Sequence, residues 1–227
     1  MDGLADGARA ELVLQGKRES FFRDLFARQV ALENPNVLCK PEWDIPRAAA
    51  ERWVQATPSI TKTKGVVDLA LLSPDDLFTE HPLGLVEFKL WYSVDAVSPS
   101  KFAGSTAVHH SIPKSAAVDR GKIRAVRNGA AGDDYLVTYV VTPHIDRVPV
   151  APGQTIRTTL EILEVAYWKV LVNKKWLEEG YDSIRTRGLQ AAAEAIGNAC
   201  GETKVAHLVT GVSRGVPVSI DCLLTRV

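Results

Sequence analysis

The sequence predicts an α/β fold with a central mixed β-sheet flanked by helices. Stretches with helical periodicity alternate along the chain with short apolar runs, and these runs are bounded by glycine or proline and contain many β-branched residues. The composition, 46% hydrophobic and 24% charged, is ordinary for a globular protein. A chain of 227 residues can bury a large core as a single domain, which is the organisation we expect.

Composition and charge exclude several classes of protein. Lys and Arg number 27 and Asp and Glu number 27, so a mainly basic protein that coats nucleic acid is not indicated. No apolar run approaches the roughly 18 residues of a membrane span, and the acidic N-terminus has no apolar core of a secretory signal. Cys39, Cys200 and Cys222 contain no CxxC pair, which argues against a disulfide framework and a zinc cluster. We therefore expect a cytoplasmic protein without membrane association.

The N-terminal part predicts a helix, a strand and a second helix. Residues 19–33 carry apolar side chains along one helical stripe, and Asn34-Pro35 ends this helix because the residue before proline avoids the helical region. Residues 36–40 suit a short strand, and residues 47–55 suit a helix. Long connections are expected near residues 41–64, on either side of the predicted helix at 47–55, and near residues 93–113.

Two intensely apolar runs follow, at residues 65–72 and 84–91. Each begins at a glycine and contains β-branched or large apolar residues, which is typical of strands that are buried on both faces of a sheet. The segment between them contains Ser, Pro and Asp and is expected to be a loop.

The remaining elements are predicted in the same way. A helix at 114–129 is closed by Asn128-Gly129, and a buried strand at 134–143 ends in proline. A helix at 158–179 has Thr158 or Thr159 as its N-cap. A further helix at 188–200 and two strands around a glycine-bounded turn complete the chain.

Three ionisable residues interrupt the two apolar runs: Asp68 in the first, and Glu87 and Lys89 in the second. Glu87 and Lys89 are two residues apart, so they project from the same face of a strand. Burial of such groups is costly unless they pair or bind something. If the two strands are neighbours, Asp68 comes beside Glu87, and a divalent ion with hard oxygen ligands would neutralise both carboxylates. The simpler alternative is an ion pair at the edge of the sheet without a catalytic role.

This pattern resembles the PD-(D/E)XK nuclease superfamily. Asp68 is followed nineteen positions later by Glu87-Phe88-Lys89, on the second and third strands after an N-terminal helix. The motif has a proline directly before the aspartate, and this sequence has Val67 at that position. The resemblance implies a single nuclease-like domain over residues 1–227, with a restriction-endonuclease-like core at about 19–143 and a C-terminal extension at 144–227.

The resemblance also implies roles for these residues. Asp68, Glu87 and the carbonyl of Phe88 would bind Mg²⁺ or Mn²⁺, and Lys89 would position and polarise the attacking water. Many members add a glutamate from the first helix, for which we select Glu19 over Glu11 and Glu33. The implied reaction is metal-dependent hydrolysis of phosphodiester bonds by an endonuclease of the restriction, repair or defence type. DNA is favoured over RNA because most members cut DNA, and a homodimer is expected for a double-strand cutter.

Basic residues gather in the predicted helix at 114–127. Arg120, Arg124 and Arg127 fall on one helical face, which a nucleic-acid phosphate backbone would fit. A solvated cationic face is the alternative. Trp91 shares the face of Glu87 and is either a base-stacking or a packing residue. The predicted nucleic-acid-binding residues are Lys64, Arg120, Lys122, Arg124 and Arg127, with Lys62 and Lys114 nearby.

Other signals are weaker. Gly211-Val212-Ser213-Arg214-Gly215 matches the nucleophile-elbow pattern, but a strand-like segment follows it and no histidine lies downstream, so we expect a hairpin turn. His109-His110 is only a pair in a polar segment.

A nuclease-like fold that binds nucleic acid or a protein without cutting is the alternative function. A protein-interaction domain is the other, and the zero net charge fits it.

Overall fold

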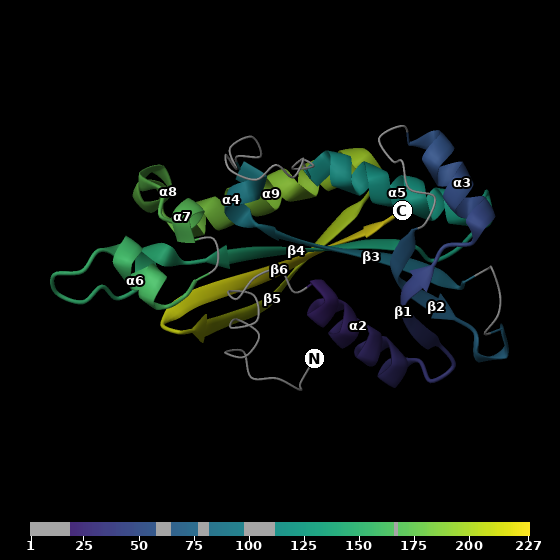
Figure 1. Cartoon of the computed structure of the whole chain (residues 1–227), viewed down its shortest axis with the longest axis horizontal. Coiled ribbons are helices and arrows are strands. Elements are labelled where there is room, and N and C mark those ends of the chain that lie inside the picture. Colours follow the sequence, from purple (N-terminus) through teal and green to yellow (C-terminus); the bar gives the residue numbers. More distant parts are fainter. Residues whose placement is uncertain (1–18, 58–64, 77–81, 98–111, 166–167) are drawn as a thin grey trace.

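The structure is a computed structural model that describes residues 19–57, 65–76, 82–97, 112–165 and 168–227 (Figure 1). Its strands form one mixed sheet in the order β1-β2-β3-β4-β6-β5, which confirms the predicted α/β class. The strands are β1 (Leu38–Asp44), β2 (Val66–Leu72), β3 (Gly84–Tyr92), β4 (Tyr135–Pro143), β5 (Thr203–Ser213) and β6 (Val216–Arg226). The helices are α2 (Glu19–Glu33), α3 (Arg47–Ala56), α4 (Ser93–Val97), α5 (Ile112–Arg127), α6 (Ile156–Ile162), α7 (Trp168–Leu171), α8 (Lys174–Glu179) and α9 (Tyr181–Cys200).

Strands β3 and β4 are the parallel pair of this sheet, and their connection contains α5. A parallel pair needs such a crossover because the chain must return to the same end of the sheet. The other neighbouring strands are antiparallel. Strand β4 pairs with β6 along the whole length of β4, so the C-terminal part of the chain extends the sheet that the first half begins.

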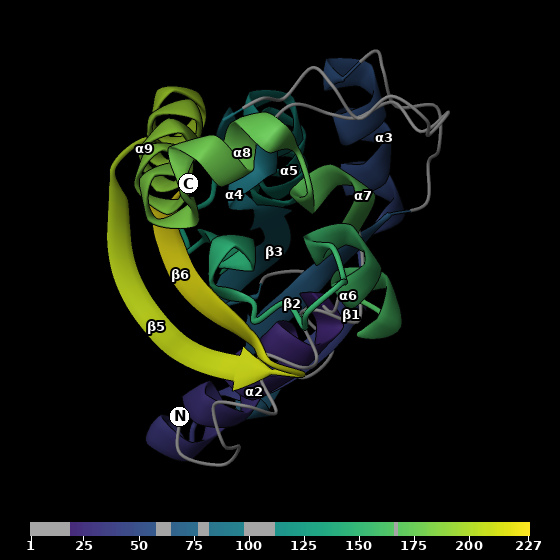
Figure 2. The same cartoon turned by 90° about the vertical axis from the view of Figure 1, so that its left-hand side faces the viewer.

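Helices cover both faces of the sheet (Figure 1). Helices α3, α5 and α9 lie on one face, where Ile123 and Val126 of α5 are buried against β2. Helix α2 lies on the other face, and its Phe22 ring is 4.4 Å from that of Tyr139 on β4. Figure 2 shows that β5 and β6 bend together as a curved hairpin beside α9. The site described below lies between the two helical layers, near the middle of the sheet.

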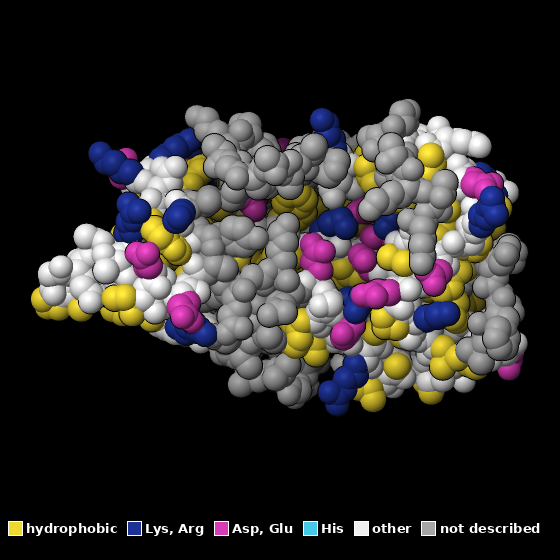
Figure 3. All heavy atoms as spheres, viewed as in Figure 1, with side chains coloured by type: hydrophobic (Ala, Val, Ile, Leu, Met, Phe, Trp, Pro, Cys, Tyr) yellow, Lys and Arg dark blue, Asp and Glu magenta, His cyan; other side chains and the backbone are white. Residues whose placement is uncertain are grey.

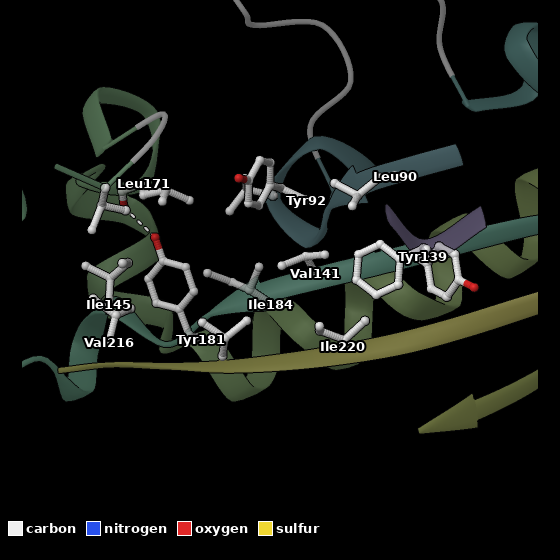
Figure 4. Packing of buried hydrophobic residues seen from close by; sticks show 14 of the residues in the cluster. Leu90, Tyr92, Tyr139, Val141, Ile145, Leu171, Tyr181, Ile184, Val216 and Ile220 are labelled. Atoms are coloured by element: carbon white, nitrogen blue, oxygen red, sulfur yellow. Dashed lines mark hydrogen bonds between the residues drawn. The ribbon is translucent and has the colours of Figure 1, made fainter. Parts of the chain in front are cut away.

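The largest apolar cluster joins the sheet to the N-terminal end of α9 (Figure 4). Tyr139 and Val141 of β4 and Ile220 of β6 are each no more than 2% exposed. The hydroxyl of the fully buried Tyr181 donates a hydrogen bond to the carbonyl of Leu171, so this polar group is satisfied inside the core. Burial of this extent stabilises α9 against the sheet.

The predicted helix at 158–179 is wrong. The chain instead forms α6, α7 and α8, because Glu164 adopts a left-handed conformation with φ of 53° and Asn173 begins a new helix by accepting a hydrogen bond from the Lys175 amide. The N-cap of α6 is Thr155 and neither of the predicted threonines. Apolar spacing alone could not reveal these turns, since the spacing continues through them.

Helix α9 is longer than the predicted helix at 188–200. It begins at Tyr181, directly after Gly180, which has a φ of 83° and allows the chain to turn into the helix. The amide of Tyr181 donates to the Asp146 carboxylate at 3.0 Å, which satisfies a donor at the helix start.

The other predicted elements agree with the structure within a few residues. Two segments that were expected to be connections contain regular structure: β1 runs through Pro41 to Asp44, and α4 occupies the start of the segment at 93–113. A proline is tolerated in β1 because β1 is an edge strand. The nucleophile-elbow pattern is the β5–β6 turn, as predicted. The three cysteines are free thiols. In the described part of the chain, no helix is long and apolar enough to cross a membrane.

Candidate active site

The candidate site lies where β2 separates from β3. Their pairing ends at Leu69 and Val86, so the next amides of β3 lose their partners on β2. Carboxylates replace them: the Phe88 amide donates to Asp68 Oδ2 at 2.7 Å, and the Leu90 amide donates to Glu19 Oε1 at 3.0 Å. Side chains from β2 and α2 therefore converge on the middle of β3.

Glu87 is the most deeply buried acid of this region, with 1% of its side chain exposed. Its Oε1 accepts a hydrogen bond from Lys122 Nζ of α5 at 2.5 Å. The same ammonium group donates to the Val66 carbonyl at 3.0 Å. Glu87 Oε2 has no hydrogen-bond partner among the described residues. One oxygen of a buried carboxylate is thus held in place while the other is unsatisfied, which is costly unless a ligand uses it.

Lys89 lies on the same side of β3 and contacts a second residue of α5. Its Nζ is 3.1 Å from Asp119 Oδ2 and donates to the Phe88 carbonyl at 3.1 Å. Asp119 Oδ1 is also 3.8 Å from Lys122 Nζ. Lys89 is 22% exposed, more than Glu87, Asp119 or Lys122, so among these four side chains it is the most accessible to solvent. We name Glu19, Asp68, Glu87, Lys89, Asp119 and Lys122 the β3–α5 cluster.

The pKa values in the cluster depend on burial and on the fact that its carboxylates outnumber its lysines. Burial raises the pKa of Glu87 well above its ordinary value; Lys122 opposes this shift, whereas Asp119 and Asp68 add to it. Burial alone would lower the pKa of Lys89, but Asp119 and the other carboxylates outweigh it and raise the pKa. Lys89 is therefore a firmly protonated ammonium group in the metal-free protein.

The cluster reaches solvent through Lys89, whose side chain is 22% exposed, and Figure 3 shows one face of the molecule. Acidic and basic side chains gather there in a band between α5 and α2, with apolar side chains around them. A site of this kind can bind a charged ligand, because its charged groups are largely buried between packed elements while Lys89 stays accessible to solvent.

The four catalytic residues that the sequence predicts, Asp68, Glu87, Lys89 and Glu19, all belong to this cluster. The sequence analysis missed Asp119 as a site residue and assigned Lys122 to nucleic-acid binding. A signal for both was present. Asp119 and Lys122 share the helical stripe of the buried Ile123 and Val126, where charged residues are unusual.

The donor atoms are of the type that a hard divalent cation prefers. Asp68 and Glu87 supply carboxylates, the Phe88 carbonyl lies beside them, and Mg²⁺ commonly takes one or two carboxylates from a protein. The unsatisfied Glu87 Oε2 is a free oxygen for such an ion. No group of three or more His, Cys, Asp or Glu side chains suited to a metal occurs in the described ranges. That one ion bridges Asp68 and Glu87 stays a prediction.

Most of the predicted nucleic-acid-binding residues contact other parts of the fold. Besides Lys122, Arg127 pairs with Asp134 at 2.5 Å and is 9% exposed, and Arg120 donates to the Ala199 carbonyl. Arg124 is exposed on α5. Lys64, Lys62 and the histidine pair at 109–110 lie outside the described residues. Trp91 is partly buried against an apolar cluster that includes Ala192 and Ile196 of α9, in agreement with a packing role.

A second buried ionic group lies under the first turns of α9. Arg185 donates to both oxygens of Asp221, at 2.7 and 2.6 Å, and His207 Nδ1 is 3.0 Å from Asp221 Oδ1. We name Arg185, His207 and Asp221 the α9–β6 cluster. Asp221 is 2% exposed, and its carboxylate is satisfied on both oxygens.

Nearby, His144 Nε2 is 2.8 Å from Ser219 Oγ, and His144 Nδ1 is 3.4 Å from Asp182 Oδ1. The order of these groups is that of a serine-hydrolase triad. Ser219 and His144 are each only 2% exposed, so a substrate carbonyl has no access to the hydroxyl. Ser219 and His144 are therefore part of the core, and the group is not arranged as a hydrolytic site.

Comparisons of this chain with protein-family models, with curated proteins and with solved structures find no match.

Proposed function

We propose that the protein is a metal-dependent nuclease that hydrolyses phosphodiester bonds, with the β3–α5 cluster as its active site. The observation that carries the proposal is the buried Glu87 with one unsatisfied oxygen, beside Asp68 and Lys89 at the point where β2 leaves β3. The element order supports a restriction-endonuclease-like core. Helix α2 precedes three antiparallel strands, and α5 then leads to β4, which is parallel to β3.

Asp68, Glu87 and the Phe88 carbonyl would hold Mg²⁺ or Mn²⁺. When bound, such an ion neutralises the phosphate and lowers the pKa of a bound water. Glu19 and Asp68 hold the β3 backbone in place through the Leu90 and Phe88 amides, which keeps the site open where a strand partner would otherwise pair.

Lys89 is the residue that we assign to the attacking water. Its ammonium group is partly exposed and is aimed by Asp119 and by the Phe88 carbonyl, so it can donate a hydrogen bond to a nucleophile or a phosphate oxygen at a fixed place. We expect Lys89→Ala to lower the cleavage rate by about 100-fold and to leave most of the affinity for nucleic acid. Single-turnover cleavage and a binding titration in Ca²⁺ separate the two effects.

DNA is the proposed substrate. If the enzyme cuts both strands, we expect it to act as a homodimer. Of the described residues predicted to bind nucleic acid, Arg124 is the one exposed on α5 and available for phosphate contacts, and Lys64 is a second candidate from the sequence. Each lost phosphate contact lowers the salt dependence of binding by about one in the logarithmic slope. Arg124→Ala should therefore weaken the binding of all sequences alike, and RNA in place of DNA tests the choice of substrate.

The test of the function is cleavage of plasmid DNA and of RNA in Mg²⁺, Mn²⁺, Ca²⁺ or EDTA. We expect nicking in Mg²⁺ or Mn²⁺ that EDTA abolishes and that Glu87→Gln loses. Glu161→Gln is the matched control, because it removes the same charge at an exposed position of α6. Binding without cleavage under every condition would favour a nucleic-acid-binding module instead.

A further inference from the structure

Lys122 occupies a position in the β3–α5 cluster that the proposed catalytic motif does not explain. It comes from α5 and not from the two motif strands, and its ammonium group lies 2.5 Å from Glu87 Oε1, 3.0 Å from the Val66 carbonyl and 3.8 Å from Asp119 Oδ1. The side chain is 10% exposed and lies over the ring of Trp53, 5.6 Å from its centroid. Three oxygen atoms and an aromatic face thus hold this cation in one place.

The charge of the cluster is unbalanced by two units. Four carboxylates face two ammonium groups among the described residues, which leaves a formal charge of −2 when all are ionised. A single divalent cation compensates this charge. A second divalent cation would make the buried cluster positive, which is unfavourable in a site that is largely shielded from water.

The free oxygens at Glu87 also favour a single metal ion. Enzymes with two catalytic metal ions hold them about 3.5–4 Å apart, and a carboxylate with both oxygens free can bridge such a pair. Glu87 cannot bridge two ions here, because Lys122 Nζ already occupies Oε1 and leaves Oε2 as its unsatisfied oxygen. Lys89 likewise lies against Asp119 and the Phe88 carbonyl.

From these contacts we propose that Lys122 is a positioning residue that replaces a second metal ion, so that the active site binds one divalent cation per chain. The proposal rests on the proposed function, because it assumes that the cluster binds a metal. Lys122 orients Glu87 through Oε1, and Glu87 then presents Oε2 to the ion.

The experiment is a titration of the full chain with Mn²⁺, followed by electron paramagnetic resonance of the free and the bound ion. We expect about one Mn²⁺ per chain and, at saturation, the spectrum of an isolated ion without coupling between neighbouring ions. Two ions per chain with a coupled spectrum would overturn the proposal. Binding of no Mn²⁺ would contradict the proposed function itself, so the two failures are distinguishable.

Variants of α5 sharpen this test. Lys122→Met removes one positive charge at similar volume and frees Glu87 Oε1, so a second ion gains an oxygen ligand and enters a less positive cluster; we expect about one additional Mn²⁺. Lys122→Arg keeps the charge and should bind as the parent does. Lys114→Met removes an exposed charge of the same helix and is the matched control. A folded Lys122→Met that still binds a single ion would contradict the proposal, and the spectrum of the unmodified protein decides the matter if this variant does not fold.

Discussion

The β3–α5 cluster and the α9–β6 cluster each contain an almost fully buried carboxylate but differ in how their charges are balanced. In the α9–β6 cluster, one buried carboxylate receives two hydrogen bonds from Arg185 and lies beside His207. In the β3–α5 cluster, four carboxylates share two lysines, and Glu87 retains an oxygen without a partner.

This difference separates a structural ion pair from a candidate binding site. A satisfied buried pair holds two elements together and has nothing left to offer a ligand. A buried cluster with surplus negative charge is costly by itself, and a bound cation relieves that cost. Deep burial of an acid is therefore not the distinguishing feature, since Glu87 and Asp221 are both almost fully buried.

The largest expected effect is on catalysis. Glu87→Gln should lower the rate of DNA cleavage by about 1,000-fold, because it removes a carboxylate that would hold the metal. Asp221→Asn, the corresponding change in the α9–β6 cluster, should alter the rate by no more than about threefold at temperatures where the variant is folded. Single-turnover cleavage in Mg²⁺ measures both. Equal losses in the two variants would remove the distinction between the clusters.

For the stability of the fold, in contrast, we expect a large effect from the α9–β6 cluster. Arg185→Met leaves the Asp221 carboxylate buried without its main partner and should lower the free energy of unfolding by about 3 kcal/mol. Urea denaturation of this variant and of the parent gives the difference. Arg187→Met is the control, since it removes a half-exposed arginine of the same helix and should cost less than about 1 kcal/mol. Similar losses in both would mean that the buried pair has no special role.

The pH dependence of stability should have opposite signs in the two clusters. Burial raises the pKa of Glu87, so its contribution to stability is present at low pH and declines as the pH rises above about 4.3. Burial also opposes ionisation of Asp221, but hydrogen bonds from Arg185 and His207 lower its pKa overall. Its contribution is present above about pH 3.9 and is lost as the pH falls.

These signs can be measured by urea unfolding between pH 3 and pH 7 in EDTA, with a slope of up to about 1.4 kcal/mol per pH unit for each group. Relative to the parent, Glu87→Gln should become more stable as the pH rises, and Asp221→Asn should become more stable as the pH falls. Parallel curves for parent and variants would show that neither group is linked to folding.

The smallest effect concerns the buried serine near the α9–β6 cluster. Ser219→Ala removes the hydrogen bond to His144 and should cost about 1 kcal/mol of stability. It should leave nuclease activity unchanged, because Ser219 lies outside the β3–α5 cluster. A loss of activity in the folded variant would require that this hydroxyl takes part in the reaction.

The sequence alone determined the motif and most of the elements around it. Helical spacing predicted α2 and α5, and apolar runs bounded by glycine predicted β2 and β3, because local periodicity reports which side chains are buried. Charged residues inside those runs identified Asp68, Glu87 and Lys89 for the same reason: an ion in an apolar strand needs a partner.

Only the tertiary structure decided what those ions contact. Asp119 and Lys122 belong to a helix 32 and 35 positions after Glu87, and the crossover between β3 and β4 brings that helix over the site. The same packing turns Arg120 and Arg127 toward carbonyl and carboxylate groups of the fold, which removes them from the predicted binding face. Spacing along the chain carries no information on such contacts, because they depend on how distant elements meet and on which side chain then lies nearest to a buried charge.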